Sequence, residues 1–536
     1  MELNPKCDPS LRVRTKHGTY IGFRDERFHT ANFRNVRFGT AERWQNARFP
    51  DTTADDVFEA TQFGPAPVQP AEKWGSLTLG GMDEQCLNMN IYTKDLTGSG
   101  KAVMVWVFPG MQIIGSNQGS VDMGSHHGKS YDASALVAEN EDIVVVVPNY
   151  RVGVFGSVNL SFLPDFDERY AASNNLARTD LLLALRWIHE NIEAFGGDPE
   201  NVTMFGQSAG ANNITAMLLC EEAHPYFKRA ISESSFIYDI SATTWEDSLT
   251  ISREYFRILG ASTIGEALEK SADELLAAQE ALNSRSVDGS SAFADIQSKS
   301  FSPVVDNVVI PKDYWKRLIN RGCEGKTVML GTTEGEYDQQ FARWAGQPDA
   351  EEKARAFVIQ QNWGKLDPAR GTHPEILDRY VQNYSDERTK FEAYKDLKAD
   401  LFLRAGAMAY ARVLSQYTDV YVYYFSYNFY PGTSERAPHG SEVSIVFKND
   451  VDASPEFQQA VAQSWVSFAR TGDPNNQYLK AEWKPYDTEN NYTLLLSETP
   501  ELRHGVRMDD IYTVIPATLE YEQVPEYRAL WKGTEK

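Results

Sequence analysis

One pentapeptide has the pattern of a catalytic serine. The segment Gly206–Gly210 (GQSAG) matches G-x-S-x-G, between an apolar run at Asn201–Phe205 that predicts a strand and a helical pattern over Ala211–Cys220. A sharp strand-to-helix turn exposes the serine oxygen, and the flanking glycines prevent clashes. The amides of the following helix would face an oxyanion formed there. The motif alone is common by chance, and a structural serine in a tight turn is the alternative. The context favours Ser208 as a nucleophile.

A serine hydroxyl needs a base, and in a strand–turn–helix enzyme of this kind the acid and the histidine follow the serine in the chain. Four histidines do so: His224, His373, His439 and His504. We favour His439, because Gly440 follows it in a loop after the predicted strand Val420–Phe425. His224 lies at the exit of the nucleophile helix, where a surface role is expected, and His504 is the second candidate.

The acid is less well defined by the pattern. Glu334 closely follows the predicted strand Thr327–Leu330. A carboxylate at the carboxyl end of a parallel strand is well placed for catalysis, so Glu334 is the predicted acid. Glu336 and Asp338 are so near in sequence that spacing does not exclude them.

Strand-like and helical segments alternate along the chain, which predicts an α/β fold with a large, mostly parallel sheet covered by helices on both faces. Buried strands are expected at Val103–Phe108 and Ile143–Val147 because both are continuous apolar runs that end at proline. The other expected elements are helices at Asp180–Phe195 and Pro455–Arg470, helical insertions at Trp245–Leu282 and Ala350–Leu414 that cap the pocket, and a polar loop at Ser284–Ser302. We expect residues 1–536 to form a single domain.

Charge and composition exclude several function classes. The chain has 536 residues, a net charge of −23 and a pI near 4.9, so it would repel a phosphate backbone and nucleic acid is not an expected partner. No apolar run is long enough to span a membrane, and residues 1–18 lack the pattern of a signal peptide. Four scattered cysteines indicate reduced thiols, and we predict a cytoplasmic protein. The pair His126–His127 is interpreted as a surface loop rather than a metal site.

Several segments together resemble the type-B carboxylesterase family, which includes cholinesterases and lipase-like esterases. The most specific is Asn191–Gly210 (NIEAFGGDPENVTMFGQSAG), and the others include Asp83–Tyr92, Gly331–Gly335 and Ala437–Phe447. The resemblance covers nearly the whole chain and implies the α/β-hydrolase fold. It also implies that Ser208 is the nucleophile, Glu334 the acid and His439 the base. Because all three are present, a non-catalytic binding protein on the same scaffold is disfavoured.

The chain departs from the family pattern in the loop that binds the oxyanion. Where the family has His-Gly-Gly-Gly-Phe, this sequence has Phe108-Pro-Gly-Met-Gln112. By position, the resemblance assigns the oxyanion donors to the amides of Gly110, Met111 and Ala209. Pro-Gly is also a natural type II turn pair. The bulky Phe108 and Met111 are expected to narrow the acyl side of the pocket.

Three further departures concern the substrate and the redox state. Gln207 stands where cholinesterases carry a glutamate, which argues against a choline ester. Cys86 resembles one half of a family disulfide whose other half is replaced by Pro67. Trp74 resembles the aromatic cation site of cholinesterases, but its spacing from Cys86 favours a core or rim role.

The predicted reaction is hydrolysis of a small carboxylic ester through an acyl-enzyme, without metal or organic cofactor, by a monomer or homodimer. The alternative is a biosynthetic relative that uses the same triad for transesterification, lactonisation, elimination or cyclisation, since its oxyanion loop is altered. Loss of one oxyanion donor typically slows catalysis by a factor of roughly a hundred to a thousand.

Overall fold

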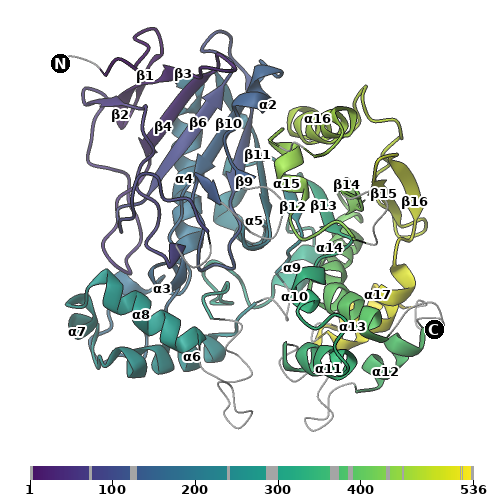
Figure 1. Cartoon of the computed structure of the whole chain (residues 1–536). Coiled ribbons are helices and arrows are strands. Elements are labelled where there is room, and N and C mark those ends of the chain that lie inside the picture. Colours follow the sequence, from purple (N-terminus) through teal and green to yellow (C-terminus); the bar gives the residue numbers. More distant parts are fainter. Residues whose placement is uncertain are drawn as a thin grey trace.

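The computed structural model describes residues 4–532, apart from 72–74, 121–128, 238–241, 285–299, 362–373, 384–389, 430–434, 450–451, 519–520 and 522. Its centre is one large twisted sheet (Figure 1). The strands of this sheet are β3 (Phe23–Arg24), β4 (Ala31–Arg37), β6 (Asn88–Thr93), β7 (Lys101–Val107), β10 (Ile143–Pro148), β11 (Gly197–Gln207), β12 (Arg229–Glu233), β13 (Thr327–Thr333), β14 (Val420–Phe425), β15 (Tyr492–Leu496) and β16 (Glu501–His504).

The middle of the sheet is parallel and its two edges are antiparallel. The strand order is β16-β15-β14-β13-β12-β11-β7-β10-β6-β4-β3. All pairs from β15 to β10 are parallel, whereas β16 and the three strands β6, β4 and β3 pair antiparallel. Every residue of β7 and β10 is buried, as expected for strands covered on both faces. A small separate sheet joins β1 (Arg12–Thr15), β2 (Gly18–Ile21) and β5 (Val57–Glu59), and β8 (Gly119–Ser120) pairs with β9 (Lys129–Ser130).

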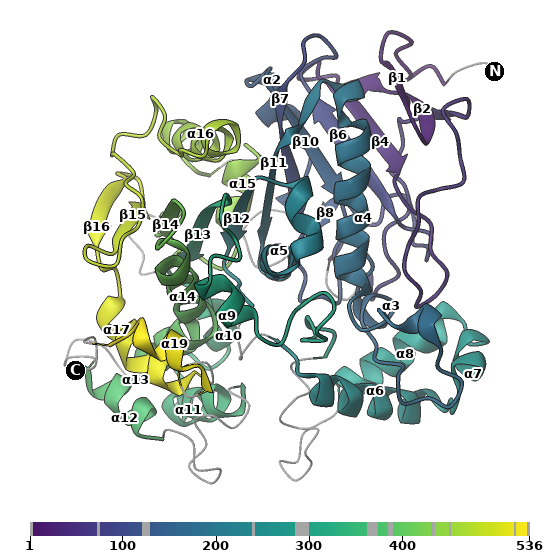
Figure 2. The same cartoon turned by 180° about the vertical axis from the view of Figure 1, so that it is seen from behind.

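Helices cover the sheet on both sides. On one face α4 (Leu176–Asn191) and α5 (Ala209–Leu219) pack on β11, and Figure 2 shows them in front of the sheet. From the other face α16 (Pro455–Thr471) packs on β7 and β11, next to α15 (Glu442–Val446). The shorter elements near these are α2 (Ser134–Ala138), α3 (Gly153–Gly156), η1 (Glu168–Tyr170), η2 (Ile192–Phe195), η3 (Glu221–Tyr226) and α9 (Tyr314–Ile319).

Two groups of inserted helices lie at the same end of the molecule, the lower end in Figure 1. This is the end at which β10 leads into α3. One group is α6 (Trp245–Leu259), α7 (Ile264–Leu268) and α8 (Ala272–Asn283). The other contains α10 (Asp338–Ala342), α11 (Ala350–Gln361), α12 (Pro374–Asn383), α13 (Lys390–Ala399), the π-helical turn η6 (Asp400–Arg404), α14 (Ala405–Leu414), α17 (Met508–Val514), η7 (Ile515–Ala517) and α19 (Pro525–Ala529).

The predicted strands and helices are confirmed where the structure describes them, with shifts at their ends. The helix expected at Asp180–Phe195 begins four residues earlier, at Leu176, and its last turn is the separate η2. Gly196 ends it with a left-handed φ of 87°, a conformation that glycine adopts without a steric penalty. Most of the polar loop expected at Ser284–Ser302 lies outside the described residues. No helix of the described chain is both long and apolar enough to cross a membrane.

Candidate active site

Ser208 lies on a strained turn between β11 and α5. Its backbone has φ 54° and ψ −123°, a region that ordinary residues avoid at a cost of about 1–3 kcal/mol. The turn is fixed on both sides, because Ser208 N–H donates to the Glu233 carbonyl at 2.8 Å and Asn212 N–H donates to the Ser208 carbonyl at 2.9 Å. A Cβ on Gly210 would lie 2.0 Å from the Val107 carbonyl oxygen. Only glycine therefore lets α5 start this close to β7.

His439 is paired with a fully buried carboxylate. Its Nδ1 lies 2.5 Å from Oε2 of Glu336, whose side chain has no exposed surface. The other Glu336 oxygen accepts the backbone N–H of Thr333 at 2.7 Å. Burial alone would raise the pKa of Glu336. The charge of His439 and the hydrogen bonds from His439, Ser234 and Thr333 outweigh it, so the pKa lies below the usual range. Glu336 is therefore an anion that can orient His439 and stabilise its protonated form.

The predicted acid, Glu334, is not the partner of His439, which is a correction. In the turn after β13, Thr333 N–H donates a hydrogen bond to the Glu336 carboxylate. The same turn forms a β-bridge between Gly335 and Pro438, the residue before His439. In this arrangement the carboxylate of Glu336 points toward His439. Glu334 instead lies half-buried by Arg436 and Arg404, and burial raises its pKa despite these two charges.

The remaining acid and histidine candidates also lie elsewhere. Asp338 forms an ion pair with Arg436, at 2.8 Å from its Nε. His224 contacts the Leu218 carbonyl at 2.9 Å. His504 is an exposed residue of the edge strand β16. His373 lies outside the described residues.

Gln207, the neighbour of Ser208, contacts the second nitrogen of His439. The distance between Gln207 Nε2 and His439 Nε2 is 3.0 Å. Because an amide NH₂ only donates, this contact requires a lone pair on Nε2 and places the imidazole proton on Nδ1, toward Glu336. That is the tautomer of a general base. It also places Nε2 of His439 beside the turn that contains Ser208.

The loop after β7 offers two unused amides beside this turn. Gly110 has φ 135°, and the left-handed stretch continues into Met111 (φ 55°) and Gln112 (φ 64°). The loop closes through Ile113 and Ile114 N–H, which both donate to the Gly110 carbonyl. Within the described chain, neither Gly110 N–H nor Met111 N–H has an acceptor. The Ala209 amide begins α5, where no earlier turn of that helix supplies an acceptor.

The positions of two side chains in this loop, Phe108 and Gln112, differ from what the sequence predicts. Phe108, expected to narrow the pocket, is fully buried and stacks on Tyr150 with 4.1 Å between ring centroids. Its carbonyl accepts the Tyr150 hydroxyl at 2.6 Å. Gln112 points inward and donates to the Ala209 carbonyl at 2.9 Å and to Asn213 Oδ1 at 3.1 Å. Sequence reasoning missed this role of Gln112, and the only signal was an amide in an otherwise apolar segment. Met111 is 47% exposed.

Comparison with known proteins identifies the family of this fold and site. The model of the carboxylesterase family matches residues 9–513. This chain belongs to the carboxylesterase family. It is 29% identical to a para-nitrobenzyl esterase of Bacillus subtilis (strain 168), over 83% of this chain and 86% of that protein. It is 30% identical to a liver carboxylesterase of Sus scrofa, over 76% of this chain and 73% of that one.

Solved structures agree with this assignment. The chain superposes on the Geobacillus stearothermophilus carboxylesterase EST55 with a TM-score of 0.78 and 26% identity, over 94% of this chain and 99% of that one. A PNB esterase gives a TM-score of 0.77 at 27% identity, over 94% and 100%. The α/β-hydrolase fold is thereby confirmed, and the protein is a carboxylic ester hydrolase. Among the described residues of this carboxylesterase, no group of three or more His, Cys, Asp or Glu could hold a metal ion.

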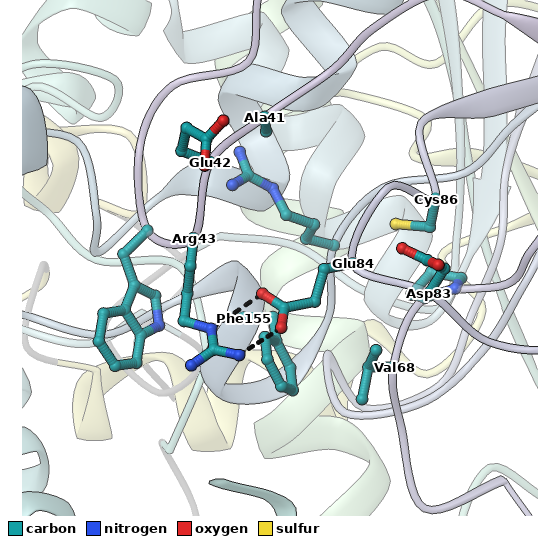
Figure 3. A pocket seen from close by; sticks show the side chains of 11 residues that line it. Ala41, Glu42, Arg43, Val68, Asp83, Glu84, Cys86 and Phe155 are labelled. Atoms are coloured by element: carbon teal, nitrogen blue, oxygen red, sulfur yellow. Dashed lines mark hydrogen bonds and ion pairs between the residues drawn. The ribbon is translucent and has the colours of Figure 1, made fainter. Parts of the chain in front are cut away.

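Cys86 lines a small pocket that Ser208 does not line, among the segments of residues 41–44, 67–68 and 83–86 (Figure 3). Its thiol is free and buried, consistent with Pro67 in place of a second cysteine. An ion pair joins two of these segments, because Arg43 Nε lies 2.9 Å from Oε2 of Glu84 (Figure 3). Arg43 Nη1 also donates to the Lys270 carbonyl at 2.7 Å. This carboxylesterase thus links the segment around Cys86 without a disulfide. Trp74 and the pair His126–His127 lie outside the described residues.

Proposed function

We propose that Ser208, His439 and Glu336 form the catalytic triad of this ester hydrolase. The observation that carries the proposal is the contact of His439 with Glu336 on one nitrogen and with the residue next to Ser208 on the other. His439 accepts the proton of Ser208 as its Oγ attacks the ester carbonyl, and later delivers that proton to the leaving alcohol. Water then releases the acid from the acyl-enzyme. Glu336 holds the imidazole and balances its charge.

The amides of Gly110, Met111 and Ala209 are the proposed oxyanion donors. They support this role because the first two have no acceptor in the described chain and the third begins a helix. When the Ser208 hydroxyl donates to Nε2 of His439, the Gln207 amide must release that nitrogen. The rearrangement is small, because one donated hydrogen bond replaces another. Catalytic hydrogen bonds are often loose until substrate binds.

The proposed substrates are uncharged esters of short acids. Gln207 is neutral, so it offers no anion to a choline group. Met111 is partly exposed beside the amides, where its side chain limits the length of the acyl group.

Steady-state hydrolysis of p-nitrophenyl esters from acetate to decanoate tests this proposal, with Ser208→Ala as control. We expect turnover that Ser208→Ala abolishes and that is fastest for the short chains. Turnover equal to that of the Ser208→Ala variant would contradict hydrolysis by this serine. Product formation only when an acceptor alcohol is added would favour the transferase alternative.

We also propose that the chain acts in the cytoplasm as one catalytic domain, monomeric or homodimeric. Its four cysteines are all free, which suits a reducing compartment. The core extends from Leu11 to Trp531 in one main hydrophobic cluster. Fractionation of cells and light scattering of the purified protein test location and oligomeric state.

A further inference from the structure

Arg178 is a buried arginine that has no ion-pair partner among the described residues. Arg178, in the first turn of α4, is only 1% exposed. Within the described chain its Nε and Nη2 have no hydrogen-bond acceptor, and no carboxylate lies within ion-pair distance. Asp306 is the acid whose charge acts on it. That carboxylate is already bonded to Asn175 and to the amides of residues 308–310.

Tyr150 connects this arginine to the loop. The charge of Arg178 acts on the Tyr150 hydroxyl, and that hydroxyl donates to the Phe108 carbonyl at 2.6 Å. The peptide of Phe108 immediately precedes the segment Pro109–Met111 that supplies two of the proposed oxyanion donors. The stacked rings of Phe108 and Tyr150 keep water away from this contact.

A second connection runs through the nucleophile helix. Asn213 lies beside the Tyr150 hydroxyl and accepts the Gln112 amide at 3.1 Å. Gln112 also donates to the Ala209 carbonyl and is itself in the left-handed conformation. The positions of the loop and of the first turn of α5 are therefore coupled through Gln112 and Asn213, and Asn213 shares the Tyr150 hydroxyl with the charge of Arg178.

We propose that Arg178 is an electrostatic positioning residue, whose unneutralised charge favours the negative charge that develops in the oxyanion hole. The inference rests on the proposed triad and oxyanion donors. In a low-dielectric interior a charge acts over a longer distance than in water. A pre-positioned charge also needs no reorganisation during the reaction. Arg178 stays protonated, because burial lowers its pKa only to about 10.

A purely structural role fits the surroundings less well. Burial of a charge without a partner destabilises a folded protein, so Arg178→Met, which keeps most of the apolar stem, should leave the thermal midpoint unchanged or raise it. Arg178→Lys keeps the charge. Arg229→Met is a matched control, because Arg229 is also buried, lacks a carboxylate partner in the described chain, and lies in β12 with a bond to the Ala469 carbonyl.

The test measures the rate at which a fluorophosphonate labels Ser208 and the affinity for a trifluoromethyl ketone. In the first reaction the Ser208 oxygen forms a bond to phosphorus and fluoride leaves; in the second the ketone oxygen becomes an oxyanion. We expect Arg178→Met to lower both by roughly tenfold, less than loss of a direct donor, with KM for an ester unchanged. Arg178→Lys should recover most of the loss, and Arg229→Met should change only the thermal midpoint.

Wild-type labelling rates and ketone affinity in folded Arg178→Met would overturn the role of Arg178 while leaving the triad intact. An equal loss in Arg178→Lys and Arg178→Met would also overturn it, because the charge would then not be the cause. Wild-type protein that is not labelled at Ser208 would instead overturn the proposed function itself, and this inference with it.

Discussion

At the residue scale, the proposed function depends on which partner each ring nitrogen of His439 contacts. In the proposed triad, His439 contacts Glu336 through Nδ1 and Gln207 through Nε2, so the tautomer that a general base requires is present without substrate. Glu336 is fully buried, and each of its oxygens has a hydrogen-bond partner. Glu334, two residues earlier, is similar in chemistry but contacts neither histidine nitrogen. The two glutamates therefore form a natural pair of test and control.

Replacing Glu336 with Gln should lower kcat by roughly ten-thousand-fold, as expected when a triad histidine loses the carboxylate that fixes its tautomer. Steady-state hydrolysis of p-nitrophenyl acetate measures the change. Glu334→Gln is the matched control and should retain wild-type kcat. Equal losses in the two variants would argue against Glu336 as the orienting acid.

Replacing Gln207 with Glu should shift the acid limb of the kcat/KM pH profile upward by about one unit. A carboxylate next to Nε2 stabilises the imidazolium, and a protonated His439 cannot accept the proton of Ser208. Activity in weakly acidic buffer should therefore fall while activity at alkaline pH is kept. Gln207→Met, which also removes the hydrogen bond but adds no charge, is the control; an equal shift in that variant would refute the electrostatic cause.

At the scale of elements, the turn after β7 adopts a backbone that its sequence does not favour. Left-handed glycine at Gly110 is unstrained, but Met111 and Gln112 follow in the same region. A side chain in that conformation costs roughly 1–2 kcal/mol per residue. The bonds from Gln112 to Ala209 and Asn213 in α5 offset part of this cost. The expected type II turn bond from Met111 N–H to the Phe108 carbonyl is absent, and that carbonyl accepts Tyr150 instead.

Met111→Gly should raise the free energy of unfolding by about 0.5–1 kcal/mol. Relief of the left-handed strain, roughly 1–2 kcal/mol, exceeds the backbone entropy that a glycine adds, about 0.5–1 kcal/mol. Urea unfolding measures the difference. Met82→Gly is the control, because Met82 is similarly exposed and lacks a positive φ, so this variant should lose stability. A loss in both variants would show that Met111 is not strained.

At the scale of the whole molecule, buried charges connect the loops of the proposed triad to the inserted helices. Arg404 Nη2 donates to the Glu334 carbonyl at 2.7 Å and to the Thr333 carbonyl at 2.9 Å. Arg436, three residues before His439, forms ion pairs with Asp338 and with Asp396 of α13. The acid loop and the histidine loop are thus held against the same group of helices. Removing one partner of a buried ion pair typically costs about 3–5 kcal/mol.

This network makes stability sensitive to acid. Burial alone would raise the pKa of Asp396, but Arg507, Arg436 and Arg404 outweigh it and lower the pKa to about 2. The unfolded value is about 3.9, so the unfolded chain binds more protons between these values. The stability that Asp396 contributes is therefore present above about pH 4 and is lost as the pH falls toward about 2.

In this interval Asp396→Asn should reduce the slope of unfolding free energy against pH by about 1 kcal/mol per pH unit, somewhat less than the roughly 1.4 kcal/mol that a full proton would give. Urea unfolding at a series of pH values measures the slope. The solvent-exposed ion pair of Arg14 and Asp55 provides the control, and Asp55→Asn should leave the slope unchanged because solvent screens it. A slope unchanged by Asp396→Asn would contradict the contribution of this network.

The sequence alone determined most strands and helices and the strained turn on which Ser208, the proposed nucleophile, lies. Continuous apolar runs such as those of β7 and β10 predict strands that are buried on both faces, and the glycine-flanked serine after β11 predicts the turn. These signals are local, because hydrophobic periodicity and glycine conformation act within a few residues. The resemblance of residues 191–210 to a family signature also predicted the carboxylesterase family, which the comparison confirms.

Tertiary structure alone decided between Glu334 and Glu336, because both follow β13 and only the bridge from Gly335 to Pro438 turns one of them toward His439. It likewise brought Gln112 to Asn213, which is 101 residues away in sequence, and buried Arg178 near Tyr150 with no ion pair to any other residue that the structure describes. Such contacts depend on how loops from separate strands meet at one edge of the sheet. The sequence pattern of a single segment does not predict these contacts between segments.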